Sequence, residues 1–236
     1  MYILKCLKEG SKIQIEICGL KLTFHLPEKK NYYISLGTNC FVRMAFTKFY
    51  LKPARLRGEL TCPFDLCVTP VKSLAEILEN EFSDYFNDVE FDKETNYYIN
   101  RKYLIHFIHD GHLTRDEFLT RYKKRVENFL SITKDKAPKK YILSCEQNDF
   151  SVDVLNRVYN SLLKLRNGKP FKFYVINFLH DNPPKLDLSG LTPAILYNEF
   201  DITSEYKLGW IKNFDLVAKN LNPDILKKLN NKTGTI

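Results

Sequence analysis

Alternating apolar and polar residues distinguish the start of the chain. Apolar side chains occupy every second position over residues 13–17 and again over residues 20–26, on either side of a Cys-Gly pair. A period of two that is interrupted by a glycine-containing pair predicts a β-hairpin over residues 11–26. A charged segment that begins with proline, residues 27–31, ends this pattern and predicts a turn.

The hairpin pattern divides the chain into two parts. We expect residues 1–30 to form a short N-terminal β-hairpin appendage and residues 31–236 to form the main domain. The length of 236 residues fits one large domain with such an appendage.

Apolar runs and helical spacing alternate through the main domain. Strands are expected at residues 32–36, 103–109, 141–145, 171–179 and 194–197, and helices at residues 40–50, 70–86, 114–130, 152–165, 204–221 and 223–229. Strands that are separated by helices of this length predict an α/β fold with a largely parallel sheet flanked by helices.

The composition is that of a folded globular protein, with 44% apolar and 27% charged residues. No run of about 18 apolar residues is present, and the first residues lack the apolar core of a signal peptide, so we expect a cytoplasmic protein without a transmembrane segment. The net charge of +8 is compatible with an acidic or phosphorylated ligand or with peripheral contact to an anionic membrane. Lysines interleaved with acidic residues argue against a specific nucleic-acid partner.

The six cysteines are scattered along the chain. None of their spacings matches a zinc knuckle or a redox motif, and a domain of this size does not need disulfides to fold. We expect reduced thiols, most of them buried as small apolar residues.

Polar and ionisable residues follow the predicted strands. Asn39 and Cys40 follow the first strand, His109 and Asp110 the second, and Asp149 the third. Because ligands bind beyond the carboxyl ends of the strands in an α/β sheet, these residues are candidate site residues.

Cys40 is the strongest candidate nucleophile. The first turn of a helix favours a thiolate, a neighbouring imidazole would take the proton, and a carboxylate would orient that imidazole. We prefer His109 as the base and hold His106 as the alternative, since residues three apart on a strand point to opposite faces. Asp65 and Asp149 are the candidates for the orienting carboxylate. The alternative for Cys40 is a buried packing role.

Other chemistries fit the sequence less well. The histidine-rich segment 106–112 matches no zinc or iron motif, glycine-rich phosphate loops are absent, and the Gly-x-Ser-x-Gly elbow of α/β-hydrolases is missing. We therefore expect no metal and no cofactor. Arg121 and Arg125, one helical turn apart, would either clamp an anion or form an exposed basic stripe on their helix.

Several short motifs together resemble those of a known family. Residues 34–40, Ile-Ser-Leu-Gly-Thr-Asn-Cys, are followed after 22 residues by Pro-Phe-Asp at 63–65, then by His-Asp at 109–110 and by an arginine-bearing helix at 121–125. This combination resembles a bacterial family of unknown function that is labelled as papain-like cysteine peptidases. The likeness extends over residues 32–145.

The resemblance implies that Cys40 is the nucleophile and a histidine its base, with the cysteine first in the chain as in papain. It also implies a role for Asp65 in orienting the histidine or binding substrate, with a buried turn as the alternative. Leu66 stands where the family usually has tryptophan, which alters the expected pocket wall. A papain-like α+β architecture is the alternative to the parallel sheet.

The substrate contacts expected around the catalytic set of Cys40, His109 and Asp65 come from Asn39, His106, Asp110, Arg121, Arg125 and Asp149.

Three functions are compatible with these residues. The first is a cysteine-dependent hydrolase, peptidase-like, or an acyl transferase, acting on a small-molecule, peptide or glycan substrate. The second rests on a weak likeness of the hairpin to leaders of bacterial surface-polysaccharide enzymes: a glycan-modifying or nucleotide-sugar-dependent transferase in which Cys40 only packs. The third is a non-catalytic binding domain.

Overall fold

The computed structural model describes residues 4–9, 12–17, 20–25, 33–48, 60–146, 149–179 and 186–201. The helices expected at residues 204–221 and 223–229 lie outside this described part.

The N-terminal part contains a three-stranded antiparallel sheet in the order β1-β2-β3. Its strands are β1 (Leu4–Glu9), β2 (Lys12–Ile17) and β3 (Leu20–His25). Strands β2 and β3 are paired antiparallel, with Ile17 opposite Leu20, which confirms the predicted hairpin. The sequence did not predict β1, because its apolar residues do not keep a period of two.

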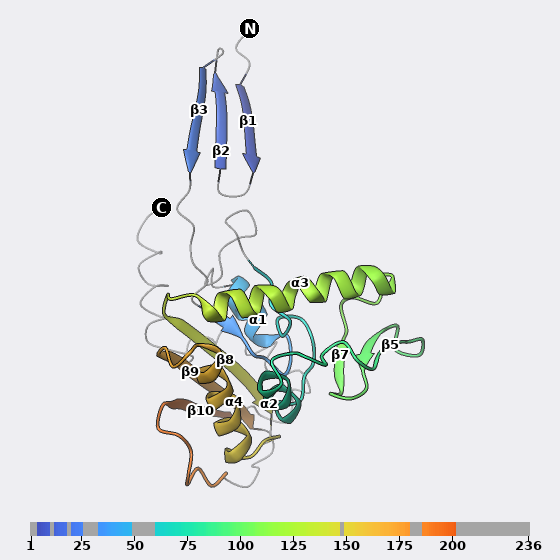
Figure 1. Ribbon diagram of the computed structural model, residues 1–236, viewed down its shortest axis with the longest axis vertical. Coiled ribbons are helices and arrows are strands. Elements are labelled where there is room, and N and C mark those ends of the chain that lie inside the picture. The colour runs from blue at the N-terminus through green and yellow to red at the C-terminus, as the bar shows by residue number, and fades with distance from the viewer. Residues whose placement is uncertain are drawn as a thin grey trace.

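A four-stranded parallel sheet forms the centre of the main domain (Figure 1). Its order is β10-β9-β8-β4, and every neighbouring pair is parallel. The strands are β4 (Tyr33–Ser35), β8 (Lys139–Glu146), β9 (Phe171–Leu179) and β10 (Ile195–Asp201). The largely parallel sheet and all four of these strands agree with the prediction.

Helices pack on both faces of this sheet. Along β8, Tyr141 and Leu143 join one apolar cluster, whereas Ile142 joins a second cluster. The second cluster contains α1 (Phe41–Lys48), and the first contains α2 (Val71–Glu79), α3 (Arg115–Lys134) and α4 (Val152–Leu165). This alternation explains why the strands are apolar on both sides.

Helix α2 is shorter than predicted. The apolar spacing predicted a helix to residue 86, but α2 ends at Glu79, and Glu81 and Phe82 have φ angles of 51° and 64°. The left-handed turn brings Phe82 into the core, where its ring contacts Phe64 and Phe129 at centroid distances of 5.7 and 5.4 Å. The packing of Phe82 in the core thus accompanies the end of α2 before the predicted residue 86.

A second antiparallel sheet, separate from the parallel one, has the order β5-β6-β7. It contains β5 (Val89–Asp92), β6 (Tyr97–Asn100) and β7 (Ile105–Phe107). The prediction that the strand near residue 105 belongs to the parallel sheet is wrong. Only four residues separate β6 from β7, too few for the crossover that parallel neighbours require.

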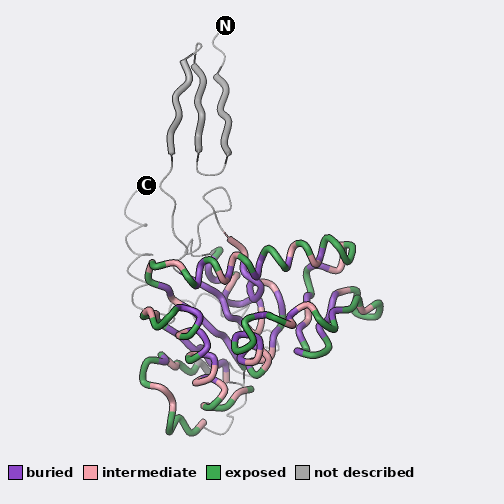
Figure 2. Tube along the Cα trace, viewed as in Figure 1, coloured by how far each residue is buried: buried purple, intermediate pink, exposed green. Residues whose placement is uncertain are grey.

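Helix α3 connects the two sheets of the main domain. It begins beside the β5-β6-β7 sheet and ends next to the start of β8 (Figure 1). Thr114 and Glu117 form a capping box at the amino-terminal end of the helix. The ring of Phe118 stacks on Tyr98 of β6 at 4.1 Å between centroids. Buried backbone follows β8 and β9, while the β5–β6 turn is exposed (Figure 2).

Candidate active site

Cys40 lies just beyond the carboxyl end of β4, at the start of α1. Its carbonyl oxygen accepts the N–H of Met44 at 3.0 Å, so the residue occupies the amino-terminal cap of the helix. The turn before it is tight, since a Cβ on Gly37 would lie 2.5 Å from the carbonyl oxygen of Asn39. Only glycine fits at that position of the turn.

The turn that carries Cys40 is fastened to the end of β8. The N–H and hydroxyl groups of Thr38 both donate to the carbonyl oxygen of Ser144, at 3.3 and 2.7 Å. The carbonyl oxygen of Thr38 in turn accepts the N–H of Thr69 at 3.1 Å. Thr69 immediately precedes Pro70 and α2, so the turn is held from two sides.

The segment that contains Thr69 also holds β7. Val68 forms an antiparallel bridge with His106, with N···O distances of 2.9 and 3.0 Å. Two adjacent residues therefore link the turn of Cys40 to the strand that leads to His109. This link brings the two sheets together at the site.

The loop after β7 is fixed by close backbone contact. A Cβ on Gly111 would lie 1.8 Å from the carbonyl oxygen of Asn96, which only glycine avoids. The N–H of Asp110 donates to the carbonyl oxygen of Phe107 at 3.3 Å, and the N–H of Leu113 donates to the backbone carbonyl oxygen of Asp110 at 3.1 Å. His109 lies within this fixed turn.

The thiol of Cys40 and the imidazole of His109 are in hydrogen-bond contact. Sγ of Cys40 lies 3.2 Å from Nε2 of His109. Cys40 is only 9% exposed, whereas His109 is exposed. Solvent therefore reaches the pair from the side of His109. Burial raises the pKa of the Cys40 thiol above its ordinary value. A raised pKa favours the neutral thiol, so a nearby base is needed to ionise it.

Asp110, the residue after His109, is the buried centre of an ionic cluster. Its carboxylate, 1% exposed, accepts hydrogen bonds from Arg121, from the hydroxyl of Tyr122 at 2.8 Å and from Arg125 at 3.3 Å. The guanidinium of Arg125 also lies over the ring of Tyr122 at 4.4 Å. The two arginines thus do not form the exposed stripe considered above. They fix the residue that follows His109.

Asn39 connects the turn of Cys40 to the end of β8. Its Oδ1 accepts the N–H of Phe41 at 3.0 Å and the hydroxyl of Ser144 at 3.3 Å, and its Nδ2 donates to Glu146 at 3.1 Å. Asp149 is exposed near this point, with its N–H donating to the carbonyl oxygen of Glu146 at 3.0 Å.

Asp65 and His106 have structural contacts. Asp65 is fully buried, and its Oδ2 accepts the N–H of Cys62 at 2.8 Å, which matches the buried-turn alternative. The guanidinium of Arg43 lies 3.9 Å from the same oxygen. His106 packs against Tyr97 at 5.8 Å between centroids. The proposed roles of Asp65, of Asp149 and of the substrate-contacting residues stay predictions.

The candidate residues predicted from the sequence did not include Thr38, Ser144 and Glu146. Glu146 directly follows the apolar run of β8, so its place at a strand end was a signal for it. The hydroxyl groups of Thr38 and Ser144 bond to segments more than 100 residues away in the chain, and local sequence patterns do not indicate such contacts.

Among the described residues, no group of three or more His, Cys, Asp or Glu side chains is arranged to hold a metal ion. Cys62, Cys67 and Cys145 are buried free thiols. Within the same part of the chain, no helix has the length and apolar character needed to cross a membrane.

Comparison with family models, with curated proteins and with solved structures found no match to this chain.

Proposed function

We propose that the protein is a cysteine-dependent hydrolase or acyl transferase in which Cys40 is the nucleophile and His109 the base. The observation that supports this most directly is the 3.2 Å contact between Sγ and Nε2, formed by residues 69 positions apart in the chain. A pair at this distance is within reach for direct proton transfer. An exposed histidine side chain buries little surface, so its contact with the thiol of Cys40 would add little to stability.

The proposed reaction uses the pair twice. The Sγ–H proton passes to Nε2 of His109 while sulfur bonds to the carbonyl carbon and the carbonyl oxygen takes the negative charge. The carbonyl forms again as the leaving group departs with the proton from His109. Water, or another acceptor, then gives its proton to His109 and attacks the thioester, and the thiol is restored.

The amino end of α1 supports the charge that develops on the carbonyl oxygen. The first backbone N–H groups of a helix have no acceptor within the helix, and the helix dipole favours negative charge at this end. The N–H of Phe41 already donates to the side-chain oxygen Oδ1 of Asn39. The side-chain amide of Asn39, adjacent in sequence to the nucleophile, is the proposed polar contact for substrate.

The test is acylation of the protein by p-nitrophenyl acetate, read by peptide mass spectrometry. We expect an acetyl group on Cys40, with the buried thiols of Cys62, Cys67 and Cys145 unmodified. Loss of the base in His109→Ala should slow acylation of Cys40 by about 100-fold or more. His106→Ala is the matched control, because it removes the same type of side chain three residues earlier, from β7, and it should change the rate by less than about threefold.

Circular dichroism checks that each variant is folded. Equal acylation rates in the two histidine variants, or modification of Cys40 only after unfolding, would rule out the proposed pair. In that case Cys40 has only a packing role, and the glycan-modifying transferase and the binding domain are the remaining functions.

A further inference from the structure

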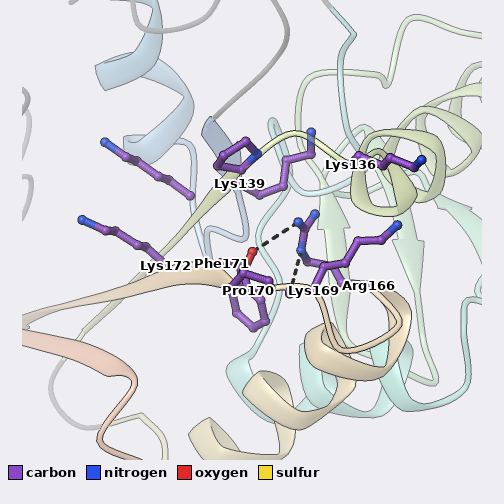
Figure 3. A pocket seen from close by; sticks show the side chains of 9 residues that line it. Lys136, Lys139, Arg166, Lys169, Pro170, Phe171 and Lys172 are labelled. Atoms are coloured by element: carbon purple, nitrogen blue, oxygen red, sulfur yellow. Dashed lines mark hydrogen bonds between the residues drawn. The ribbon is translucent and has the colours of Figure 1, made fainter.

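A basic pocket lies at the amino-terminal end of the parallel sheet, where β8 and β9 begin (Figure 3). Its volume is about 430 Å³. The lining residues are Lys136, Pro138, Lys139, Lys140, Arg166, Lys169, Pro170, Phe171 and Lys172. Six of these nine residues carry a cationic side chain, while the remaining three are apolar.

The apolar part of the pocket is rigid. Pro138 and Pro170 have restricted backbones, and Phe171 is held by two neighbouring rings. Its centroid lies 5.3 Å from that of Tyr141, edge to face, and 5.0 Å from that of Tyr159. The pocket therefore presents a preformed apolar surface inside a ring of positive charge.

Arg166 supplies a buried positive charge. The side chain is 1% exposed, and its guanidinium donates to the carbonyl oxygens of Thr133 at 2.9 Å, of Lys169 and Pro170 at 3.3 Å and of Ala137 at 3.4 Å. All four hydrogen bonds go to carbonyl groups, which are dipoles and leave the full charge in place. Dashed lines in Figure 3 mark the hydrogen bonds of Arg166 with the lining residues Lys169 and Pro170.

The lysines surround the pocket. Lys139 pairs with Asp135 at 2.8 Å, and Lys169 donates to the carbonyl oxygen of Lys134 at 3.3 Å. Lys136 and Lys172 are exposed and lie on opposite sides of the pocket in Figure 3. Since the amines are spread out, they match a ligand with more than one negative charge.

We propose that this pocket binds a small molecule that carries two or more phosphate charges on an apolar or flat group. An apolar cavity of several hundred Å³ with a few charged groups is typical of small-molecule sites. The flat group would contact Phe171 and the two prolines, and the phosphates would lie near Lys136, Lys169 and Lys172. The proposal does not depend on the Cys40 chemistry, which lies at the other end of the same sheet.

The test uses calorimetric titration of the full chain with ADP and with inorganic pyrophosphate at low salt. We expect ADP to bind with a dissociation constant below about 1 mM, more tightly than pyrophosphate, and to weaken as salt is added. The double variant Lys136→Glu/Lys172→Glu should bind ADP at least about tenfold more weakly. The matched control Lys72→Glu/Lys93→Glu reverses two exposed lysines outside the pocket and should bind as the wild type does.

Each other result overturns the proposal. Equal weakening in both double variants would mean that ADP responds to net charge alone. Equal affinity for pyrophosphate and ADP would remove any role for the apolar surface, and no binding of ADP would remove the site. Binding to phosphatidylcholine vesicles that contain phosphatidylglycerol, without binding to ADP, would assign the basic surface to a membrane.

Discussion

The two ends of the parallel sheet differ in the chemistry of their side chains. At the carboxyl end, Cys40 and His109 meet beside the exposed carboxylate of Glu146. At the amino end, a pocket is lined by five lysines and Arg166. Strand β8 belongs to both ends, since it begins at Lys139 and finishes at Glu146. One parallel sheet thus separates two chemical environments by the length of a strand.

The buried charges at the two ends are also compensated differently. Beside the candidate active site, the buried carboxylate of Asp110 is paired with cationic groups, Arg121 and Arg125. At the amino end, the buried guanidinium of Arg166 is held by carbonyl oxygens. Removing one partner of a buried ion pair lowers stability strongly, because the other charge stays buried without a partner. The stability that Arg166 contributes depends instead on its planar group of N–H donors, which matches several carbonyl oxygens at once.

The largest effect on stability is expected from Asp110→Asn. The change removes the charge that Arg125 needs in the core, so the free energy of unfolding should fall by about 3 kcal/mol. The turn of His109 loosens with it, and acylation of Cys40 should slow. Urea denaturation measures the first effect. Asp116→Asn, at the exposed start of α3, is the control and should cost less than about 1 kcal/mol. Equal costs would show that the buried cluster is not stabilising.

A smaller effect is expected from Arg166→Lys at the amino end. Lysine keeps the charge but loses the planar donor group, so carbonyl oxygens lose hydrogen bonds and unfolding should become about 2 kcal/mol easier. Arg101→Lys, on the exposed surface, should change stability by less than about 0.5 kcal/mol. The rate of Cys40 acylation should not change in either variant. A slower rate in Arg166→Lys would show that the two ends of the sheet are coupled.

The smallest effect concerns alkaline pH and Cys67, whose thiol is fully buried near the active site. Burial raises the pKa of Cys67 from 9.0 to about 12. The unfolded chain then loses this proton at lower pH than the folded chain, so the stabilisation present below pH 9 is lost as pH rises toward 12. From pH 8 to pH 10 the loss from this thiol is about 1 kcal/mol.

Chemical denaturation of the wild type and of Cys67→Ala at both pH values measures this contribution. The variant should lose about 1 kcal/mol less over the interval. Parallel pH dependence in the two proteins would mean that Cys67 ionises equally in the folded and unfolded chains.

The sequence predicted most of the main sheet. Residues 152–165 and 171–179 were assigned correctly to α4 and β9, because long apolar patterns with clear caps are decided locally. Strands β5 and β6 were missed because each is only four residues long, and so short a segment gives little periodicity. The premature end of α2 depends on where Phe82 packs, which local spacing does not contain.

The candidate site was predicted in part. Cys40 and His109 were named from their positions after strands, and the contact between them agrees with that choice. The route by which they meet was not predictable, since His109 follows a strand of the antiparallel sheet. The contact depends on the pairing of Val68 with His106 and of Thr38 with Thr69, which are backbone hydrogen bonds between distant segments.

That pairing makes Cys40 a reporter of how the chain assembles. The turn after β4 of the parallel sheet carries the thiol, and the loop after β7 of the small antiparallel sheet carries the imidazole, so the pair exists only when the two sheets are docked. A partial unfolding event that detached the small sheet would leave most of the secondary structure in place and still remove the base. Reactivity of Cys40 during refolding would therefore time the docking step itself, separately from the formation of either sheet.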